Sequence, residues 1–270
     1  MSEPGGTPDP EAADAPEPTV AATGRVRVTT SVIEAMQAVQ DAVRHHPWAV
    51  AADLDRRPLR RVIEKLRERL PDLDRNRHYA VRRRRAGEAS HVLVAYWPPV
   101  RGHTGFFVLL SSDPDDGSRE PYRDVRERDG RLVLRSGWWE LVRYTASGAA
   151  APRWTWTMSA AREQRLIRQI DKAVAQRDRE SDKWLADLGV AASRWPGFHG
   201  VRQAHRRLGR RLEERWRRVR KSGEKPPAWR RLPYARKRAR AIDHAHETGG
   251  DRRRRALAAA ALKGPDDVPR

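Results

Sequence analysis

The chain has 270 residues, of which 56 are Lys or Arg and 36 are Asp or Glu, so its formal net charge is +20. It contains no cysteine, which excludes disulfide bonds, thiolate zinc sites and a cysteine nucleophile. No stretch approaches the roughly 18 apolar residues of a membrane span, and the N-terminus lacks the basic and apolar regions of a signal peptide. We therefore expect a soluble, cytoplasmic protein with no membrane partner.

The positive charge is concentrated towards the C-terminus. Residues 1–23 carry 5 acidic and no basic side chains, residues 24–150 carry 24 basic and 17 acidic ones, and residues 151–270 carry 32 basic and 14 acidic ones. The excess is densest in residues 194–255, where 22 basic and 6 acidic side chains leave +16. Such a surface draws polyanions to it by long-range attraction and counterion release.

The first elements in the chain are a tail and a pair of helices. Residues 1–24 are acidic and rich in Pro, Ala and Gly, which is typical of a disordered tail. Ser31 and Glu34 have the spacing of a capping box, and apolar residues then recur at helical spacing until Pro47. A second helix is predicted from about residue 57 to residue 70, with Pro71 after it.

The pattern then changes to that of β-strands, and we predict an antiparallel meander of about five or six strands. The segment 104–110 is apolar on both faces, which indicates a central strand covered on both sides. The segment 77–85 ends in four arginines, as an edge strand does. Residues 25–158 are thus expected to form a domain of the α+β class. Its strands are predicted at residues 77–85, 90–97, 104–110, 131–135, 138–144 and 153–158.

A basic helical region is predicted over residues 159–248, followed by a basic tail or short helix over residues 249–270. One long helix is expected from Ser159 until the chain reaches Trp195-Pro196-Gly197. The next is expected from about residue 200 to residue 220, and a further short helix over residues 229–246. The helix at 200–220 has a core-facing stripe formed by Val201, His205, Leu208, Leu212, Trp216 and Val219.

The helix predicted at residues 200–220 is the strongest candidate for a binding surface. Outside the apolar stripe its surface is almost entirely arginine, and only Glu213 and Glu214 are available locally to balance the charge. Arginines one turn apart can contact successive phosphates, and a helix fits the major groove of DNA. The candidate nucleic-acid-binding residues here include Arg206, Arg207, Arg210, Arg211, Arg217 and Arg218.

Residues 229–240 extend this candidate surface. Trp229 and Tyr234 are interleaved with cations, and two arrangements fit this pattern. Either the rings stack on unpaired bases while the cations hold the backbone, or both rings pack on the preceding helix and the cations alone contact nucleic acid. The cations of this segment are Arg230, Arg231, Arg236, Lys237, Arg238 and Arg240.

A second basic cluster lies on the first predicted strand and consists of Arg82, Arg83, Arg84 and Arg85. A β-ribbon can enter a groove or follow RNA. Charge on an edge strand also prevents unwanted pairing with other strands, and we favour that interpretation for this cluster.

No catalytic, metal or cofactor site is predicted, and we expect no cofactor. The chain contains no dinucleotide-binding, P-loop, serine-hydrolase or zinc-protease motif. His244 and His246 are two residues apart and do not share a helix face, which disfavours a metal site there. Four acidic residues lie in a loop with ordinary turn chemistry, not on rigid elements that face one cleft. They are Asp113, Asp115, Asp116 and Glu120.

These observations predict a non-enzymatic bacterial protein that binds nucleic acid, with DNA favoured over RNA, and that has possible protein partners in a nucleoprotein complex. By analogy, such a chain suits an accessory role in the replication, transfer or regulation of a mobile element. One alternative is a nuclease or recombinase, which would need His91, His103 or the acidic loop to meet in one cleft. Another is a structural subunit of a ribonucleoprotein, whose basic helices would become ordered only on RNA.

Overall fold

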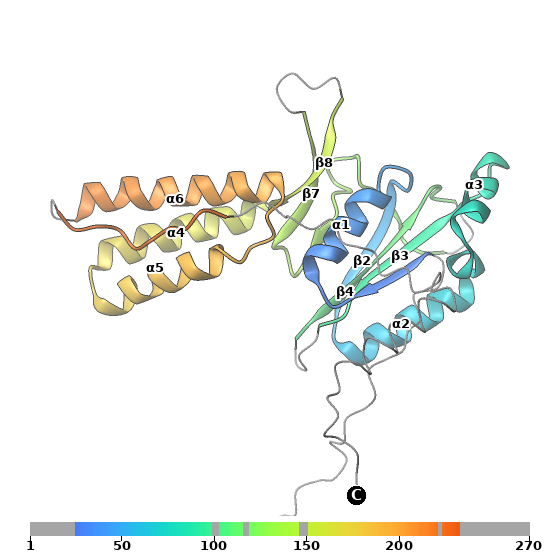
Figure 1. The fold of residues 1–270 in the computed structure, drawn as a ribbon, viewed down its shortest axis with the longest axis horizontal. Coiled ribbons are helices and arrows are strands. Elements are labelled where there is room, and N and C mark those ends of the chain that lie inside the picture. The colour runs from blue at the N-terminus through green and yellow to red at the C-terminus, as the bar shows by residue number, and fades with distance from the viewer. Residues whose placement is uncertain (1–24, 99–102, 116–118, 146–150, 221–222, 233–270) are drawn as a thin grey trace, which may run out of the picture.

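The computed structural model describes residues 25–98, 103–115, 119–145, 151–220 and 223–232. These residues form two β-sheets and an arm of three helices that extends away from them (Figure 1). Helices and strands are combined in an α+β arrangement, as predicted. The predicted acidic tail and the predicted C-terminal elements beyond residue 232 lie outside the described residues.

The larger sheet has five strands in the order β1-β3-β4-β2-β5. Strand β1 runs parallel to β3, whereas the other neighbouring pairs are antiparallel. The sheet is therefore mixed, and the prediction of a purely antiparallel meander was wrong. Parallel pairing needs a long crossover between the two strands, and the chain between β1 and β3 provides it. The strands are β1 (Val26–Thr29), β2 (Trp48–Leu54), β3 (His91–Tyr96), β4 (Gly105–Ser111) and β5 (Arg123–Asp124).

Two predicted helices are confirmed and cover opposite faces of this sheet. The first, α1 (Val32–Ala42), is capped by the side chain of Ser31 and buries Met36 against one face. The second, α2 (Arg56–Arg69), buries Ile63 against the other. Strand β4 is buried along its whole length between them, as predicted for a central strand.

The segment predicted as the first strand is a helix, α3 (Arg77–Arg85), which follows the short 3₁₀ helix η2 (Pro71–Asp74). The prediction of an edge strand there was wrong. The side chain of Asn76 caps the helix by accepting a hydrogen bond of 3.0 Å from the backbone N–H of Tyr79. The sequence RHYAVRRRR has no clean alternation of polar and apolar residues, and arginine is a good helix former.

The smaller sheet has three antiparallel strands in the order β6-β7-β8, and all three were predicted. They are β6 (Val133–Leu134), β7 (Trp139–Tyr144) and β8 (Arg153–Met158). The fully buried indole of Trp156 donates a hydrogen bond of 2.8 Å to the carbonyl of Met36 and so joins β8 to α1. The β7–β8 hairpin projects from the body of the protein (Figure 1).

The arm consists of α4 (Ala160–Gln176), α5 (Arg179–Ala192) and α6 (His199–Val219). The single long helix that was predicted from Ser159 is in fact two helices. The chain reverses at Arg177, whose φ of 56° is left-handed, and Asp178 then caps α5 by accepting a hydrogen bond of 2.7 Å from the backbone of Ser181. Helix α6 is confirmed within a residue at each end. No helix of the described residues is long and apolar enough to cross a membrane.

Candidate nucleic-acid interface

Helix α6 is fixed to the protein along its length. Its first turn packs on β8, where a Cβ on Gly200 would lie 2.7 Å from the carbonyl oxygen of Trp156. The rest of the helix packs on α4 (Figure 1). The arginines on its other faces therefore occupy a rigid support. The stripe that holds the helix in place is buried as predicted, through Val201, His205, Leu208, Leu212 and Trp216.

Two arginines of α6 and its C-cap residue, Arg220, are paired with acids from the other helices of the arm. Arg207 forms two hydrogen bonds, of 2.6 and 2.7 Å, to the carboxylate of Glu163. Arg211 makes a bidentate contact of the same kind with Asp171, at 2.9 and 2.6 Å. Arg220 lies 2.5 Å from a carboxylate oxygen of Asp182. The hydrogen bonds that Arg207 and Arg211 donate to these carboxylates raise the pKa of both arginines. The expectation that acidic residues do not balance this helix therefore fails for these three positions.

The side of α6 opposite its apolar stripe carries arginines that form no ion pair within the described residues. Arg206, Arg210 and Arg217 are exposed, and none of them is ion-paired in the part of the chain that the structure describes. Glu213 and Glu214 are also exposed, on the same side of the helix. Their spacing of four and seven residues places them on one face, which we call the outer face. Arg218 is also exposed and lies nearer to α4. Of the predicted arginines on this helix, these four are available to an external polyanion.

Residues 223–232 form an extended strap that returns along α5 and α6. The indole of Trp229 packs against Gly209, where a Cβ would lie 2.5 Å from its ring, and donates a hydrogen bond of 3.0 Å to the carbonyl of His205. The structure thus shows the packed arrangement for Trp229, and the four residues 229–232 are not helical. Arg230 and Arg231 are exposed beside it. The other predicted residues of this segment, Tyr234, Arg236, Lys237, Arg238 and Arg240, lie outside the described residues.

The cluster Arg82–Arg85 belongs to a different part of the molecule. It lies on α3, beside the larger sheet, while α6 lies in the arm on the other side (Figure 1). Arg83 is paired with Glu88 at 3.1 Å, and Arg84 lies 3.3 Å from the imidazole Nε2 of His46. Arg82 and Arg85 are exposed. The two basic clusters therefore do not form one surface.

The β7–β8 hairpin adds residues to the surface of α6 that the sequence analysis did not select. The ring of Tyr144 stacks on His199, the first residue of α6, with centroids 4.5 Å apart and planes 10° apart. Arg143 and Arg153 are exposed on the same hairpin. The alternation of RWTWTM predicts that Arg153 points away from Trp154, but the sequence does not show which element that face meets.

A buried polar cluster ties η2, α3 and the strand ends together. Nδ1 of His46 lies 3.1 Å from the carbonyl oxygen of Ala42 and so must donate to it, which leaves Nε2 to accept from Arg25 at 2.6 Å and from Ser90 at 3.1 Å. Burial, followed by the charge of Arg25, lowers the pKa of His46 to about 3, so the ring is neutral. Because the cluster is closed to solvent, its role is to hold the elements together.

The carboxylate of Asp72 anchors the second half of this cluster. It accepts hydrogen bonds from the Nδ1 (2.7 Å) and the backbone N–H (2.8 Å) of His91, and Arg25 lies 3.5 Å away. Burial opposes ionisation of Asp72, but these hydrogen bonds and the charge of Arg25 outweigh it and hold the pKa below its ordinary value. His91 is thus a buried structural residue.

Of the groups that the enzyme alternative requires, Asp116 lies outside the described residues, and the two histidines lie far apart. His103 lines a pocket of about 420 Å³ where the larger sheet meets the β6–β7 turn, whereas His91 lies at the opposite end of the β3–β4 pair. In the acidic loop Asp113 accepts a hydrogen bond from the backbone of Asp115, and Glu120 is paired with Arg69. Within the described ranges no three His, Asp or Glu side chains are grouped as metal ligands.

Comparison with protein-family models, with curated proteins and with solved structures finds no significant match to this chain.

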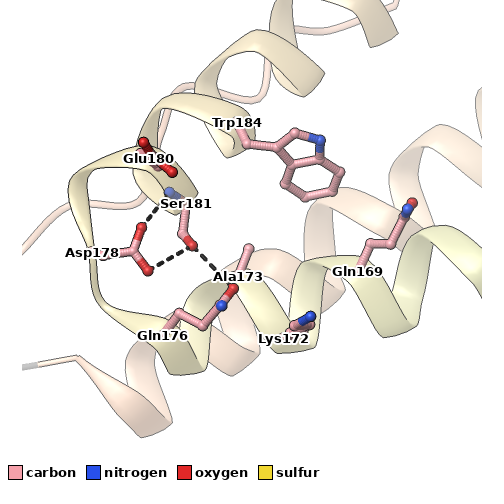
Figure 2. Close-up of a pocket in the computed structure, with 8 residues that line it drawn as sticks. All are labelled: Gln169, Lys172, Ala173, Gln176, Asp178, Glu180, Ser181 and Trp184. Carbon is pink, nitrogen blue, oxygen red and sulfur yellow. Dashed lines mark hydrogen bonds between the residues drawn. The ribbon is translucent and has the colours of Figure 1, made fainter.

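The groove between α4 and α5 differs chemically from the outer face of α6. It is open, measures about 390 Å³, and is entered by the indole of Trp184 opposite Gln169 and Lys172 (Figure 2). Among the residues that line it Lys172 is the one cation, and Asp178 and Glu180 are two acids. A groove of this composition has no excess of positive charge to attract a polyanion.

Proposed function

We propose that the protein is a non-enzymatic nucleic-acid-binding protein and that it holds its ligand on the outer face of α6. The observation that carries the proposal is the set of three exposed arginines, Arg206, Arg210 and Arg217, on one face of a packed helix, none of which forms an ion pair with another described residue. Residues one turn apart on a helix are about 6 Å apart, which lets neighbouring arginines contact neighbouring phosphates. Arg218, Arg230 and Arg231 add exposed charge around this face.

DNA is the favoured ligand because the helical face is supported by the packing of α6 on the rest of the protein. An RNA-bound structural subunit would order its basic helices only on RNA, whereas α6 is held by its own buried stripe. A helix also fits the major groove of B-form DNA, while the deep, narrow major groove of A-form RNA does not admit one. We propose that the protein acts on DNA in the cytoplasm, as an accessory factor for a bacterial mobile element.

The test compares two variants with equal loss of charge. Arg206→Ala/Arg210→Ala/Arg217→Ala removes the outer face, and Lys172→Ala/Arg179→Ala/Lys183→Ala removes three exposed cations from α4 and α5. Binding to a labelled DNA duplex two helical turns long is measured by fluorescence anisotropy. We expect the first variant to lose roughly 10- to 100-fold in affinity and the second to lose no more than about 3-fold. Equal losses would show that net charge alone determines binding, and no binding by the wild-type protein would remove the proposal.

A further inference from the structure

The β7–β8 hairpin stands at the beginning of α6 and projects past it, so that the two elements form an angle (Figure 1). The hairpin is anchored there by backbone contacts. Thr155 and Thr157 of β8 lie against Gly200, with a hydrogen bond of 3.3 Å from the Gly200 N–H to the hydroxyl of Thr155. The angle between the elements is therefore part of the packed structure.

The two faces of the hairpin carry different arginines. Tyr144 stacks on His199, so its face is the one turned towards α6. Arg153 is the cross-strand partner of Tyr144 and lies on that same face, because paired residues share a face of the sheet. Arg143 precedes Tyr144 and points the other way, where its guanidinium lies 5.7 Å from the ring of Trp154.

The face that bears Arg153 continues into the outer face of α6. His199 precedes Arg206 by seven residues and Arg210 by eleven, and all three share one side of the helix. Burial and then the charges of Arg202 and Arg206 lower the pKa of His199. Arg153 of the hairpin and the three arginines of the outer face therefore follow one line, on which Glu213 also lies. The distance along α6 from His199 to Arg217 is about 27 Å at about 1.5 Å per residue.

The aromatic rings along this line are all engaged within the protein. The ring of Tyr144 is stacked on His199, that of Trp154 lies under Arg143, and that of Trp229 is packed on Gly209. Proteins that bind single strands present free aromatic faces on which bases stack. The described part of this surface offers cations without such platforms, so it suits a backbone whose bases are already paired.

We infer that the ligand is double-stranded DNA lying in the angle between the hairpin and α6. The outer face of α6 faces a groove and its flanking phosphates, and Arg153 contacts the backbone beside it. This inference rests on the proposed function and adds to it a second contact element, the β7–β8 hairpin.

The test uses charge reversal on the two faces of one hairpin. Arg153→Glu changes the face turned towards α6, Arg143→Glu changes the opposite face, and Arg61→Glu on α2 controls for net charge, since all three arginines are exposed. Anisotropy is measured with a DNA duplex, with one of its strands alone and with an RNA duplex of the same sequence. Thermal melting shows that each variant folds.

We expect the wild-type protein to bind duplex DNA at least roughly 10-fold more tightly than the single strand or the RNA duplex. Arg153→Glu should lose roughly 10-fold in affinity for duplex DNA, and the other two variants no more than about 3-fold. The inference is overturned if Arg153→Glu binds like Arg61→Glu, or if the single strand or the RNA duplex binds as tightly as duplex DNA. Failure of the outer-face triple variant to weaken binding would instead remove the proposed function, so the two failures are distinguishable.

Discussion

Two helices of this protein carry runs of arginine, and the structure uses them differently. Helix α3 has nine residues, and two of its arginines have partners within the protein. Arg83 is paired with Glu88, and Arg84 contacts His46 in the buried cluster. Helix α6 has 21 residues and an apolar stripe that fixes it to the arm. Arg207, Arg211 and the C-cap residue Arg220 are paired within the arm, whereas the three arginines of the outer face form no ion pair within the described ranges. A run of arginine becomes a candidate binding surface where an amphipathic helix is long enough to bury one face and leave another unpaired.

The largest loss of DNA affinity is expected from charge reversal on the outer face of α6, with the same reversal on α3 as its comparison. Arg206→Glu/Arg210→Glu should lower affinity for duplex DNA by roughly 100-fold, because it places carboxylates opposite phosphates on the outer face. Arg82→Glu/Arg85→Glu removes the same charge from exposed positions on α3 and should cost no more than about 5-fold, through net charge alone. Both are measured by anisotropy in one buffer. Equal losses of affinity would mean that α3 and α6 contribute equally to DNA binding, contrary to the difference between the two helices.

The strap should depend on the absence of a side chain at position 209. A Cβ there would lie 2.5 Å from Cδ1 and 2.8 Å from Nε1 of Trp229, so in Gly209→Ala the indole must move and lose its bond to the carbonyl of His205. We expect the free energy of unfolding in urea to fall by roughly 2 kcal/mol. Gln203→Ala, an exposed change on the same helix, should have little effect.

The matching control for the strap is a double-mutant cycle. If the cost of Gly209→Ala arises from the indole, then Gly209→Ala/Trp229→Ala should be no less stable than Trp229→Ala alone. Additive losses would show that the strap is not held by this contact.

The cluster behind α3 predicts a dependence of stability on pH. The pKa of His46 is about 3 in the folded protein, whereas its ordinary value, which applies to the unfolded chain, is 6.5. As the pH falls, the unfolded chain therefore takes up a proton before the folded protein does. The contribution of neutral His46 to the free energy of unfolding is complete above about pH 6.5. Below that pH it falls by about 1.4 kcal/mol per pH unit. Urea unfolding between pH 7 and pH 5 should therefore show a steeper loss for the wild-type protein than for His46→Gln. Identical slopes would mean that His46 is protonated in the folded state.

The smallest effect is expected at the paired arginines of α6. Arg207→Ala removes the bidentate contact with Glu163. Because this pair is partly exposed, the free energy of unfolding should fall by less than about 1 kcal/mol. Its effect on DNA affinity should be smaller than that of Arg206→Ala, the adjacent residue on the outer face. A larger loss of affinity in Arg207→Ala would place the ligand on the side of α6 that faces α4.

Elements with strong periodicity could be predicted from the sequence. Helices α1, α2 and α6 and strands β3, β4, β7 and β8 all have apolar residues at regular spacing. Strand β1 has four residues and β2 is rich in alanine, so neither stands out by composition. Their places depend on pairing with β3 and β4, which no local pattern reveals.

The candidate surface could be predicted in part. Periodicity assigns the arginines of α6 to a face away from its apolar stripe, but it does not show which of them are neutralised. That depends on Glu163, Asp171 and Asp182, which precede their partners by 44, 40 and 38 residues and reach them only through the packing of the arm. The same holds for the hairpin, since the stacking of Tyr144 on His199 is a tertiary contact.

The most direct test of the central claim is the salt dependence of binding to duplex DNA. The logarithm of the association constant is plotted against the logarithm of salt concentration from about 0.05 M to about 0.2 M, and the slope falls by about 0.9 for each phosphate contact removed. We expect Arg206→Ala/Arg210→Ala/Arg217→Ala to reduce the slope by about 2 to 3, and Lys172→Ala/Arg179→Ala/Lys183→Ala to leave it unchanged. An unchanged slope in the outer-face variant would show that the phosphates lie elsewhere on the protein.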